Sequence, residues 1–275
     1  MKLKDRVALV TGGSAGLGRG IALAFAREGA GVAVCGRNEE RLDEVVREIE
    51  KAGAPGLAVR ADVSSSREVK RMFSQVLARF GTLDILVNNA GIFRSDEAGV
   101  KDRMKHLDLL TTPVPRHSLQ ITRNMSDDIW QRMFEVNVNG VFYCTREALN
   151  IMEDKGYGKI INIASISGIS AISSHSPNYS AAKGAVVAFT RSVAQEVAGA
   201  GVCVNCIAPG YIDTPEFMRG IEQMSPERKA RLMQLIPLGR IGKIDEYASL
   251  AVHLASEDAN YMVGQIISPN GGLVI

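Results

Sequence analysis

The feature that most constrains the fold is an apolar run followed by a glycine cluster near the N-terminus. Val7–Val10 is unbroken by polar residues, as is typical of a strand buried on both faces of a parallel sheet. Gly12, Gly16 and Gly18 follow, and a helical pattern then continues through Phe25. Glycines let the backbone approach a phosphate closely, and the amides of a helix N-terminus favour an anion. The segment therefore predicts a strand, a phosphate-binding turn and a helix.

This segment allows three interpretations: an ordinary glycine-rich turn, a nucleotide-triphosphatase P-loop and a dinucleotide-binding turn. Residues 13–18 also match the start of the nucleotide-triphosphatase P-loop, which continues with lysine and then serine or threonine. Arg19 and Gly20 stand there instead, so the hydroxyl that holds magnesium is missing. The spacing departs from the G-x-G-x-x-G dinucleotide fingerprint. It matches the pattern T-G-x-x-x-G-x-G, which begins at Thr11.

Strand and helix patterns alternate along the whole chain. Further strands are predicted at residues 31–35, 57–60, 83–87, 159–163, 202–207 and 264–268. Helices are predicted at residues 37–52, 66–80, 126–152 and 179–197. This alternation predicts an α/β fold: a single domain over residues 1–275 with a Rossmann-type, doubly wound, parallel seven-stranded sheet and helices on both faces. Ligands of such sheets bind at the carboxyl ends of the strands.

One long segment, Ile92 to Met125, does not follow the alternation. It carries mixed charge, two prolines and little periodicity, so we expect irregular structure. Because it follows the fourth predicted strand, it should lie over the binding edge of the sheet. We interpret it as an insertion that acts as a lid or substrate-specificity element. A mobile decoration or a contact between subunits is the alternative.

Composition and charge exclude several classes of protein. A net charge of +2 gives no electrostatic case for nucleic acid. The longest stretch without charged residues, Ile160 to Ala182, holds seven serines and is no membrane span. The first strand begins too early for a signal peptide, so we expect a cytoplasmic protein. Cys203 and Cys206 should point to opposite faces of a strand, and no metal site is predicted.

Tyr179 and Lys183 form the second strong signal. Residues four apart lie on one face of a helix, so the phenol and the ammonium are neighbours. A free tyrosine has a pKa near ~10 and is a poor acid–base catalyst at neutral pH. A nearby positive charge is expected to lower that pKa, as general acid–base catalysis requires.

These motifs together resemble the short-chain dehydrogenase/reductase family, including its 3-oxoacyl-carrier-protein reductase-like members. The resemblance covers Lys4 to Gly272 apart from the insertion, and its motifs occur in family order. They are T-G-x-x-x-G-x-G, the N-N-A-G of residues 88–91, the V-N-V-N-G of residues 136–140, a serine after the fifth strand, Y-x-x-x-K and the Pro-Gly pair of residues 209–210.

The resemblance implies a catalytic tetrad of Asn137, Ser165, Tyr179 and Lys183. Tyr179 would exchange a proton with the substrate oxygen, and Ser165 would hydrogen-bond the substrate carbonyl. Lys183 would lower the pKa of Tyr179 and hold the nicotinamide ribose. Asn137 would hold a water that links Lys183 to solvent.

Three residues near the tetrad leave alternatives open. Ser167 is an alternative to Ser165, although Ser165 directly follows the predicted strand. Asn139 is an alternative to Asn137. His175 precedes Tyr179 and could line the pocket, but we expect it to be an exposed loop residue.

The resemblance also implies the cofactor contacts. They are Thr11, Gly12, Ser14, Gly16, Leu17, Gly18, Arg37, Asn38, Asp62, Val63, Asn88, Ala90, Gly91, Tyr179, Lys183, Pro209, Gly210, Ile212 and Thr214. NAD-specific sites place a carboxylate after the second strand, whereas an arginine accommodates the 2′-phosphate of NADP. Gly36 and Arg37 stand at that place. NADP(H) is therefore favoured, and NAD(H) remains possible.

The implied activity is reversible hydride transfer between nicotinamide and a small carbonyl or secondary alcohol, in the cell a ketone reduction on 3-oxoacyl-like substrates. An NAD-dependent alcohol or sugar/polyol dehydrogenase of the same family is the alternative, and a nucleotide-binding redox sensor or scaffold is the non-enzyme alternative. No nucleic-acid or membrane partner is expected. The resemblance further implies a homotetramer with an interface of helices 126–152 and 179–197, where Ala181, Ala185, Ala188 and Ser192 form a small-residue stripe.

Overall fold

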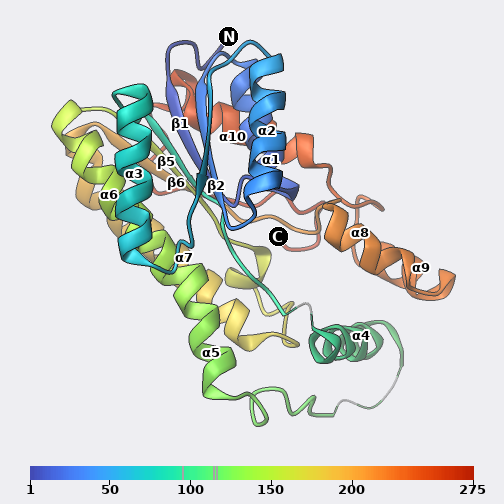
Figure 1. Ribbon diagram of the computed structural model, residues 1–275. Helices are drawn as coiled ribbons and strands as arrows, with labels where there is room; N and C mark the ends of the chain where they lie inside the picture. Colours follow the sequence, from blue (N-terminus) through green and yellow to red (C-terminus); the bar gives the residue numbers. More distant parts are fainter. Residues whose placement is uncertain (95, 114, 116) are drawn as a thin grey trace.

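The fold is built on one parallel sheet of seven strands (Figure 1). The structure, a computed structural model, describes residues 1–94, 96–113, 115 and 117–275. The strand order is β3-β2-β1-β4-β5-β6-β7. The strands are β1 (Val7–Thr11), β2 (Gly31–Gly36), β3 (Gly56–Arg60), β4 (Ile85–Asn88), β5 (Gly158–Ile163), β6 (Val202–Ile207) and β7 (Ile266–Ile267). The predicted Rossmann-type α/β fold is confirmed.

Helices cover both faces of the sheet, as its alternating side chains require. The helices are α1 (Gly16–Arg27), α2 (Glu39–Lys51), α3 (Ser66–Phe80), α4 (Glu97–Thr111), α5 (Asp127–Phe134), α6 (Gly140–Lys155), α7 (Pro177–Val197), α8 (Pro215–Glu222), α9 (Pro226–Gln234) and α10 (Ile244–Ala255). Along β1, Ala8 and Val10 join a core with α1, α2 and α10. Leu9 points to the opposite core with α3, α6 and α7, as the period of two in a strand dictates.

The topology fixes where a ligand can bind. The chain runs outward from β1 to β3, returns, and adds β4 on the other side of β1. At such a switch point the loops after the two neighbouring strands diverge and leave a crevice at the carboxyl ends. The glycine turn after β1 and the N-N-A-G segment after β4 therefore meet at this edge.

Several predicted elements differ in detail from the structure. The predicted helix over residues 126–152 consists of α5, a π-helical segment Glu135–Asn139 and α6. Helix α7 begins two residues before Tyr179, with Pro177 in its first turn, a position that tolerates proline. Strand β7 is only two residues long. Helices α8, α9 and α10 were not predicted.

The prediction of irregular structure for the insertion is wrong for residues 97–111, whereas the other described residues of the insertion form no helix or strand. Residues 97–111 form helix α4, and the side chain of Asp96 caps it by accepting from Gly99 N at 3.2 Å. Leu107 of α4 packs with Ile221 of α8 and Leu232 of α9. Packing against α8 and α9 thus stabilises a helix that the weak periodicity of the segment does not indicate. The part of the prediction that concerns residues 95, 114 and 116 lies outside the described residues.

Two further features of the described residues bear on function. None of their helices has the length and apolar character needed to cross a bilayer. They also contain no group of three or more His, Cys, Asp or Glu side chains placed to hold a metal ion. Cys206 is buried, whereas Cys203 is partly exposed and its Sγ donates to Asn260 O.

Candidate active site

The end of β1 and the segment after β4 are joined by the side chain of Thr11. Its Oγ1 donates to Val87 O at 3.2 Å and accepts from the backbone N–H groups of Asn89 and Ala90, each at 3.0 Å. Thr11 is 2% exposed. It therefore acts as a structural link between the two loops that flank the switch point.

The glycines of the turn leave room that any side chain would fill. Gly12 has φ +65° and Gly16 has φ +53°, which side chains rarely adopt. A Cβ on Gly18 would lie 2.3 Å from both Gly12 O and Asn89 Nδ2. The Asn89 amide itself donates to Thr11 O at 3.0 Å and to Gly12 O at 3.2 Å.

Asn89 is a functional position that the sequence analysis missed. It shapes the glycine turn from the neighbouring strand, and its place inside the N-N-A-G motif could have indicated it. Asn88 was predicted as a cofactor contact, but its side chain has other partners. The Asn88 amide donates to Thr145 Oγ1 at 3.0 Å and to Asn162 Oδ1 at 2.8 Å. The side chain of Asn88 thus lies in a buried network that joins β4, β5 and α6.

The N-terminus of α1 fits a pyrophosphate. Ala15 precedes the helix and makes no side-chain cap, and no acidic residue occurs in the first turn. The first backbone N–H groups of a helix lack intrahelical partners and favour an anion. Thr214 lies opposite, with its Cγ2 3.4 Å from where a Cβ of Gly16 would be. Leu17 is 7% exposed and packs in the core, so its backbone is the part that faces the turn.

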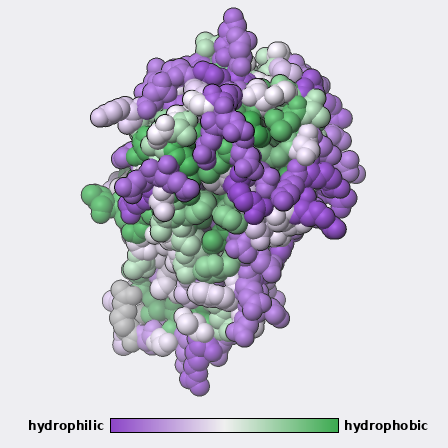
Figure 2. Space-filling model, turned by 90° about the vertical axis from the view of Figure 1, so that its left-hand side faces the viewer, coloured by the Kyte–Doolittle hydropathy of each residue, from purple (hydrophilic) through white to green (hydrophobic). Residues whose placement is uncertain are grey.

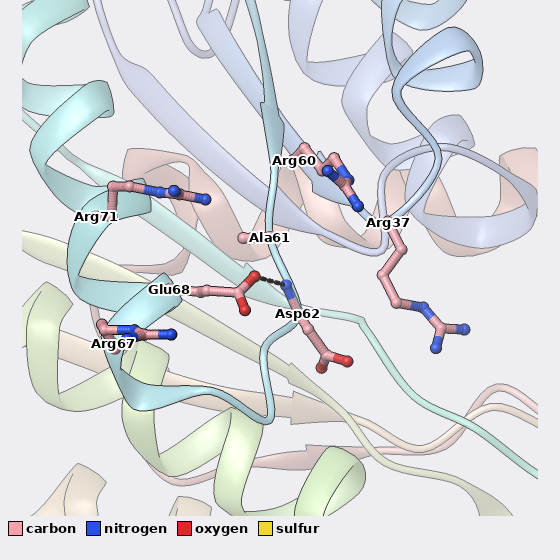
Figure 3. Close-up of a pocket in the computed structure, with 7 residues that line it drawn as sticks. All are labelled: Arg37, Arg60, Ala61, Asp62, Arg67, Glu68 and Arg71. Carbon is pink, nitrogen blue, oxygen red and sulfur yellow. Dashed lines mark hydrogen bonds between the residues drawn. The ribbon is translucent and has the colours of Figure 1, made fainter.

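Four arginines surround a cavity of about 480 Å³ beyond the carboxyl ends of β2 and β3 (Figure 3). Arg37 follows β2 and Arg60 ends β3, while Arg67 and Arg71 lie one turn apart on α3. Of these four only Arg37 was predicted. The spacing of Arg67 and Arg71 on a helix that follows Asp62 is a sequence signal for the other side of the cavity.

The acidic groups of the cavity are already engaged. Glu68 accepts from the backbone N–H of Asp62 at 3.0 Å (Figure 3). Asp62 accepts from Ser64 at 2.7 Å and pairs with Arg132 at 3.3 Å. Burial opposes ionisation of Asp62, but the contacts with Ser64 and Arg132 prevail and lower its pKa. Four guanidinium groups against two carboxylates leave the cavity positively charged.

The residues next to this cavity have small side chains or side chains with partners elsewhere. A Cβ on Gly36 would lie 3.3 Å from Ser14 Oγ, a close contact that a small shift of the serine side chain would relieve. Asn38 uses its side chain to cap α2, accepting from Arg41 N at 2.9 Å. Val63 is 6% exposed and packs close to Gly140. Arg37 is therefore the first side chain after β2 available to a ligand.

Tyr179, Lys183 and Ser165 come together at the carboxyl end of β5. Lys183 Nζ lies 5.8 Å from the centroid of the Tyr179 ring and donates to Ile163 O at 2.8 Å. Burial lowers the pKa of Lys183 to about 8. The structure therefore brings the phenol, the ammonium and the serine hydroxyl to one place, as the sequence analysis predicts.

The expected lowering of the Tyr179 pKa is corrected by the structure. Burial raises the pKa of the phenol above its ordinary value of 10.0, and a hydrogen bond with Ser165 opposes that rise. The ammonium of Lys183 is bonded to Ile163 O and stands off the ring, so it does not offset the burial. Ser165 Oγ, rather than Ser167 Oγ, is the serine in contact with Tyr179. Ser167 Oγ instead lies 2.6 Å from Ser173 Oγ.

Asn137 lies in the π-helical segment and is fully buried. Its Oδ1 accepts from Ile92 N at 3.2 Å, and its Nδ2 donates to Ile92 O at 3.0 Å. A Cβ on Gly91 would lie 2.7 Å from Asn137 Oδ1 and 3.4 Å from Lys183 Nζ. Asn137 and Lys183 thus flank the same glycine. The extra residue of a π-helical turn is frequent at functional sites.

The segment after β6 closes the site on its remaining side. Pro209 O accepts from Ile166 N at 3.0 Å, and Gly210 N donates to Pro269 O at 3.0 Å. A Cβ on Gly210 would lie 2.8 Å from Asn270 Cα, so only glycine fits there. Ile212 pairs with Gly242 in an isolated bridge. These contacts hold the segment above the carboxyl edge of the sheet.

The expectation of an exposed loop for His175 is wrong. The residue is half-buried and its Nδ1 lies 3.1 Å from the Nδ1 of His106 on α4. Burial lowers the pKa of His175 to about 3, and His106 and Arg103 add to the effect. The insertion therefore contacts the segment that leads into Tyr179.

Sequence comparison identifies relatives along the entire chain. Residues 6–99 match a family model described as short chain dehydrogenase, and residues 98–274 match one described as enoyl-(acyl carrier protein) reductase. The chain is 36% identical over 267 residues to a 3-oxoacyl-(acyl-carrier-protein) reductase FabG of Staphylococcus aureus, covering 97% of each chain. It is 34% identical over 277 residues to a 3-oxoacyl-(acyl-carrier-protein) reductase FabG of Thermotoga maritima, covering 100% of each.

Solved structures agree with these sequence relationships. A putative gluconate dehydrogenase from Agrobacterium tumefaciens superposes with a TM-score of 0.84 at 34% identity, covering 100% of this chain and 98% of that one. A levodione reductase superposes with a TM-score of 0.83 at 31% identity, covering 98% of each chain. The chain therefore belongs to the short-chain dehydrogenase/reductase family, oxidoreductases that act on CH–OH groups with a nicotinamide cofactor.

Proposed function

We propose that the protein is an NADP(H)-dependent ketone reductase that acts on 3-oxoacyl-like or similar small carbonyl substrates. The observation that carries this proposal is the cavity lined by Arg37, Arg60, Arg67 and Arg71. An adenosine 2′-phosphate carries charge that guanidinium groups bind well, whereas the 2′-hydroxyl of NAD calls for a carboxylate at the end of β2. The acidic groups of the cavity already have hydrogen-bond partners, so the positive charge of the arginines is available to the ligand.

In this proposal the chain supplies position and a proton, and the bound nicotinamide supplies the hydride. Ser165 donates a hydrogen bond to the substrate carbonyl oxygen, and Tyr179 donates the proton that this oxygen takes up. Lys183, with its pKa of about 8, remains mostly protonated at neutral pH and holds the ribose hydroxyls. Asn137 orients a water that connects Lys183 to solvent.

The cofactor contacts follow the same geometry. The glycine turn and the first turn of α1 bind the pyrophosphate, and Asp62 and Val63 face the adenine. Ala90, Gly91 and the backbone of Asn88 lie along the ribose, and the residues of segment 209–214 cover the nicotinamide. Asn38 contributes through its backbone, since its side chain caps α2.

Two alternative functions predict different results. The names of the structural neighbours, gluconate dehydrogenase and levodione reductase, describe other substrates of this family, so an NAD-dependent alcohol or sugar/polyol dehydrogenase is the first alternative. A nucleotide-binding redox sensor or scaffold is the second. Tight NADPH binding without turnover of any carbonyl would favour the sensor.

Arg37→Ala is expected to raise the KM for NADPH by about 10- to 150-fold, since a hydrogen bond to a charged group contributes about 1.5–3 kcal/mol. The KM for NADH should change little, because NADH lacks the phosphate. Steady-state kinetics with both cofactors measure the two effects. Arg27→Ala, at the far end of α1, is the matched control and should alter neither. Equal effects of Arg37→Ala on both cofactors would contradict the NADP assignment.

We also propose a homotetramer in the cytoplasm, with residues 1–275 as one catalytic domain and residues 92–125 as its lid. Figure 2 shows apolar residues across the middle of the face that carries α3 and α6, and Phe142 on α6 is 44% exposed. An apolar area on that face suits a subunit contact. Light scattering at micromolar concentration is expected to give four times the monomer mass of 29.6 kDa. A monomer would contradict this assignment.

A further inference from the structure

Helix α4 contacts two segments of the active site and carries a cation, Arg103. The two are the segment of residues 209–214 and the segment that leads into Tyr179. Figure 1 shows α4 beyond the carboxyl edge of the sheet, near α8. Leu107 packs with apolar residues of α8 and α9, and Asp108 pairs with Arg228 at 3.0 Å and with Arg231 at 3.3 Å. These contacts fix the orientation of the helix.

Arg103 lies on α4, a helix that contacts both active-site segments: Tyr211 packs against the apolar cluster that includes Leu107, and His106 contacts His175. Arg103 is partly buried, and burial lowers the pKa of its guanidinium, while Tyr211 and Glu216 act in the opposite direction. Arg103 also contributes to the lowered pKa of His175, which stands four residues before Tyr179. One turn along α4 from Arg103, His106 contacts His175 directly at 3.1 Å. Arg103 therefore acts electrostatically on residues from both sides of the site.

The guanidinium of Arg103 is held in place without being neutralised. Its Nη2 donates to Arg94 O at 3.0 Å, and its Cζ lies 5.4 Å from the centroid of the Phe93 ring. The neighbouring carboxylates serve other arginines: Asp102 pairs with Arg94, and Asp108 pairs with α9. Over the described residues, no carboxylate stands within ion-pair distance of Arg103. A partly buried cation with one backbone bond retains donors for an anion.

We propose that Arg103 binds a negatively charged group, a carboxylate or a phosphate, on the substrate, and that the preferred substrates are anionic carbonyl compounds. This inference rests on the proposed function and names its substrate class. His175, whose pKa is lowered to about 3, is neutral and can donate or accept a hydrogen bond near this site. The reacting carbonyl would lie at Tyr179 and the charged end at α4, so the distance between the two groups selects the substrate.

A cavity of about 600 Å³ beside α4 is separate from this proposal. It is lined by residues 117–123 together with His106, Leu109 and Ser174. None of the tetrad residues lines it, and Arg103 does not line it either. The charged end of the substrate is therefore assigned to Arg103 and not to this cavity.

The experiment compares matched acids and neutral analogues on the intact protein. One pair is 4-oxopentanoate and its methyl ester, and the other is dihydroxyacetone phosphate and dihydroxyacetone. Turnover with NADPH and binding by calorimetry are both measured. For at least one pair, the wild type is expected to favour the charged member. Arg103→Met is expected to lower that preference by about 10- to 100-fold and to leave the neutral member nearly unchanged.

Two further variants keep the test decisive. Arg103→Lys retains a point charge without the planar fork and should recover part of the preference. Lys105→Met removes an exposed cation from the same helix and should change nothing. Thermal melting identifies a variant that fails to fold, in which case Arg103→Lys against the wild type carries the comparison.

Each outcome of these measurements either supports or overturns the role of Arg103. A preference for the acid pair identifies a carboxylate, and a preference for the phosphate pair identifies a phosphate. A wild type that treats acids and neutral analogues alike overturns the inference, as does an Arg103→Met variant that weakens both members equally. If no carbonyl compound is turned over with either cofactor, the proposed function fails. The calorimetric preference and its loss in Arg103→Met still decide the role of Arg103.

Discussion

Tyr179→Phe is expected to lower kcat by about 100- to 10,000-fold, the range that a general acid contributes. The substitution removes one hydroxyl and keeps the ring, so the position of the ring beside Lys183 is preserved. The Kd for NADPH should stay within about twofold of the wild type, because the cofactor binds chiefly at the glycine turn and the arginine cavity. Single-turnover kinetics and fluorescence titration with NADPH separate the two quantities.

The burial of Tyr179 makes this prediction specific. A phenol with a raised pKa keeps its proton at neutral pH, so it is suited to donate it to a developing alkoxide. Tyr261→Phe is the matched control, because that side chain is fully exposed and should leave kcat unchanged. A Tyr179→Phe variant that retains more than a few per cent of the rate would assign the proton transfer to another group.

Gly18→Ala is expected to abolish tight cofactor binding and to destabilise the protein. Alanine in a helix is normally favoured over glycine by about 0.5–1 kcal/mol. Here the new Cβ would lie 2.3 Å from Gly12 O in the phosphate turn and 2.3 Å from Asn89 Nδ2, which holds that turn from the segment after β4. Overpacking of this kind costs about 1–3 kcal/mol, so the steric effect exceeds the gain in helix propensity.

The measurements for Gly18→Ala are the melting temperature and the Kd for NADPH. A cost of about 1–3 kcal/mol corresponds to a fall of several degrees in a chain of this size, roughly 2–4 °C for each kcal/mol. Gly220→Ala in α8 is the matched control, since its Cβ would meet nothing within 4 Å. That variant should be as stable as the wild type or more so. Unchanged NADPH binding in Gly18→Ala would contradict the role of the turn.

The sequence alone determined the order of the seven strands and the identity of the fold. Strand periodicity and apolar runs are local properties, so β1, β2, β3 and β6 lie within a residue or two of their predicted places. The glycine turn and the Tyr179–Lys183 pair were predictable for the same reason: each is a short motif whose geometry follows from its spacing. The spacing of four residues on α7 brings Tyr179 and Lys183 together.

Only the tertiary structure decided which other side chains reach the site. Arg60, Arg67 and Arg71 join Arg37 because β2, β3 and α3 are neighbours in space, which no single segment reveals. Asn88 and Asn89 are adjacent in sequence and look alike, yet one lies in a buried network with Thr145 and the other shapes the glycine turn. Alternation along the chain sends adjacent side chains to different surroundings.

The insertion is the clearest example of this difference between local sequence and tertiary packing. Its weak periodicity predicts irregular structure, but residues 97–111 form a helix because Leu107 and Asp108 find partners on α8 and α9. A helix of this length is marginal on its own in water and depends on such packing. The pKa of Tyr179 was likewise decided by burial within the fold, whereas the sequence showed only the nearby charge. Local spacing thus determined the motifs, while long-range packing determined their electrostatics and the placement of Arg103.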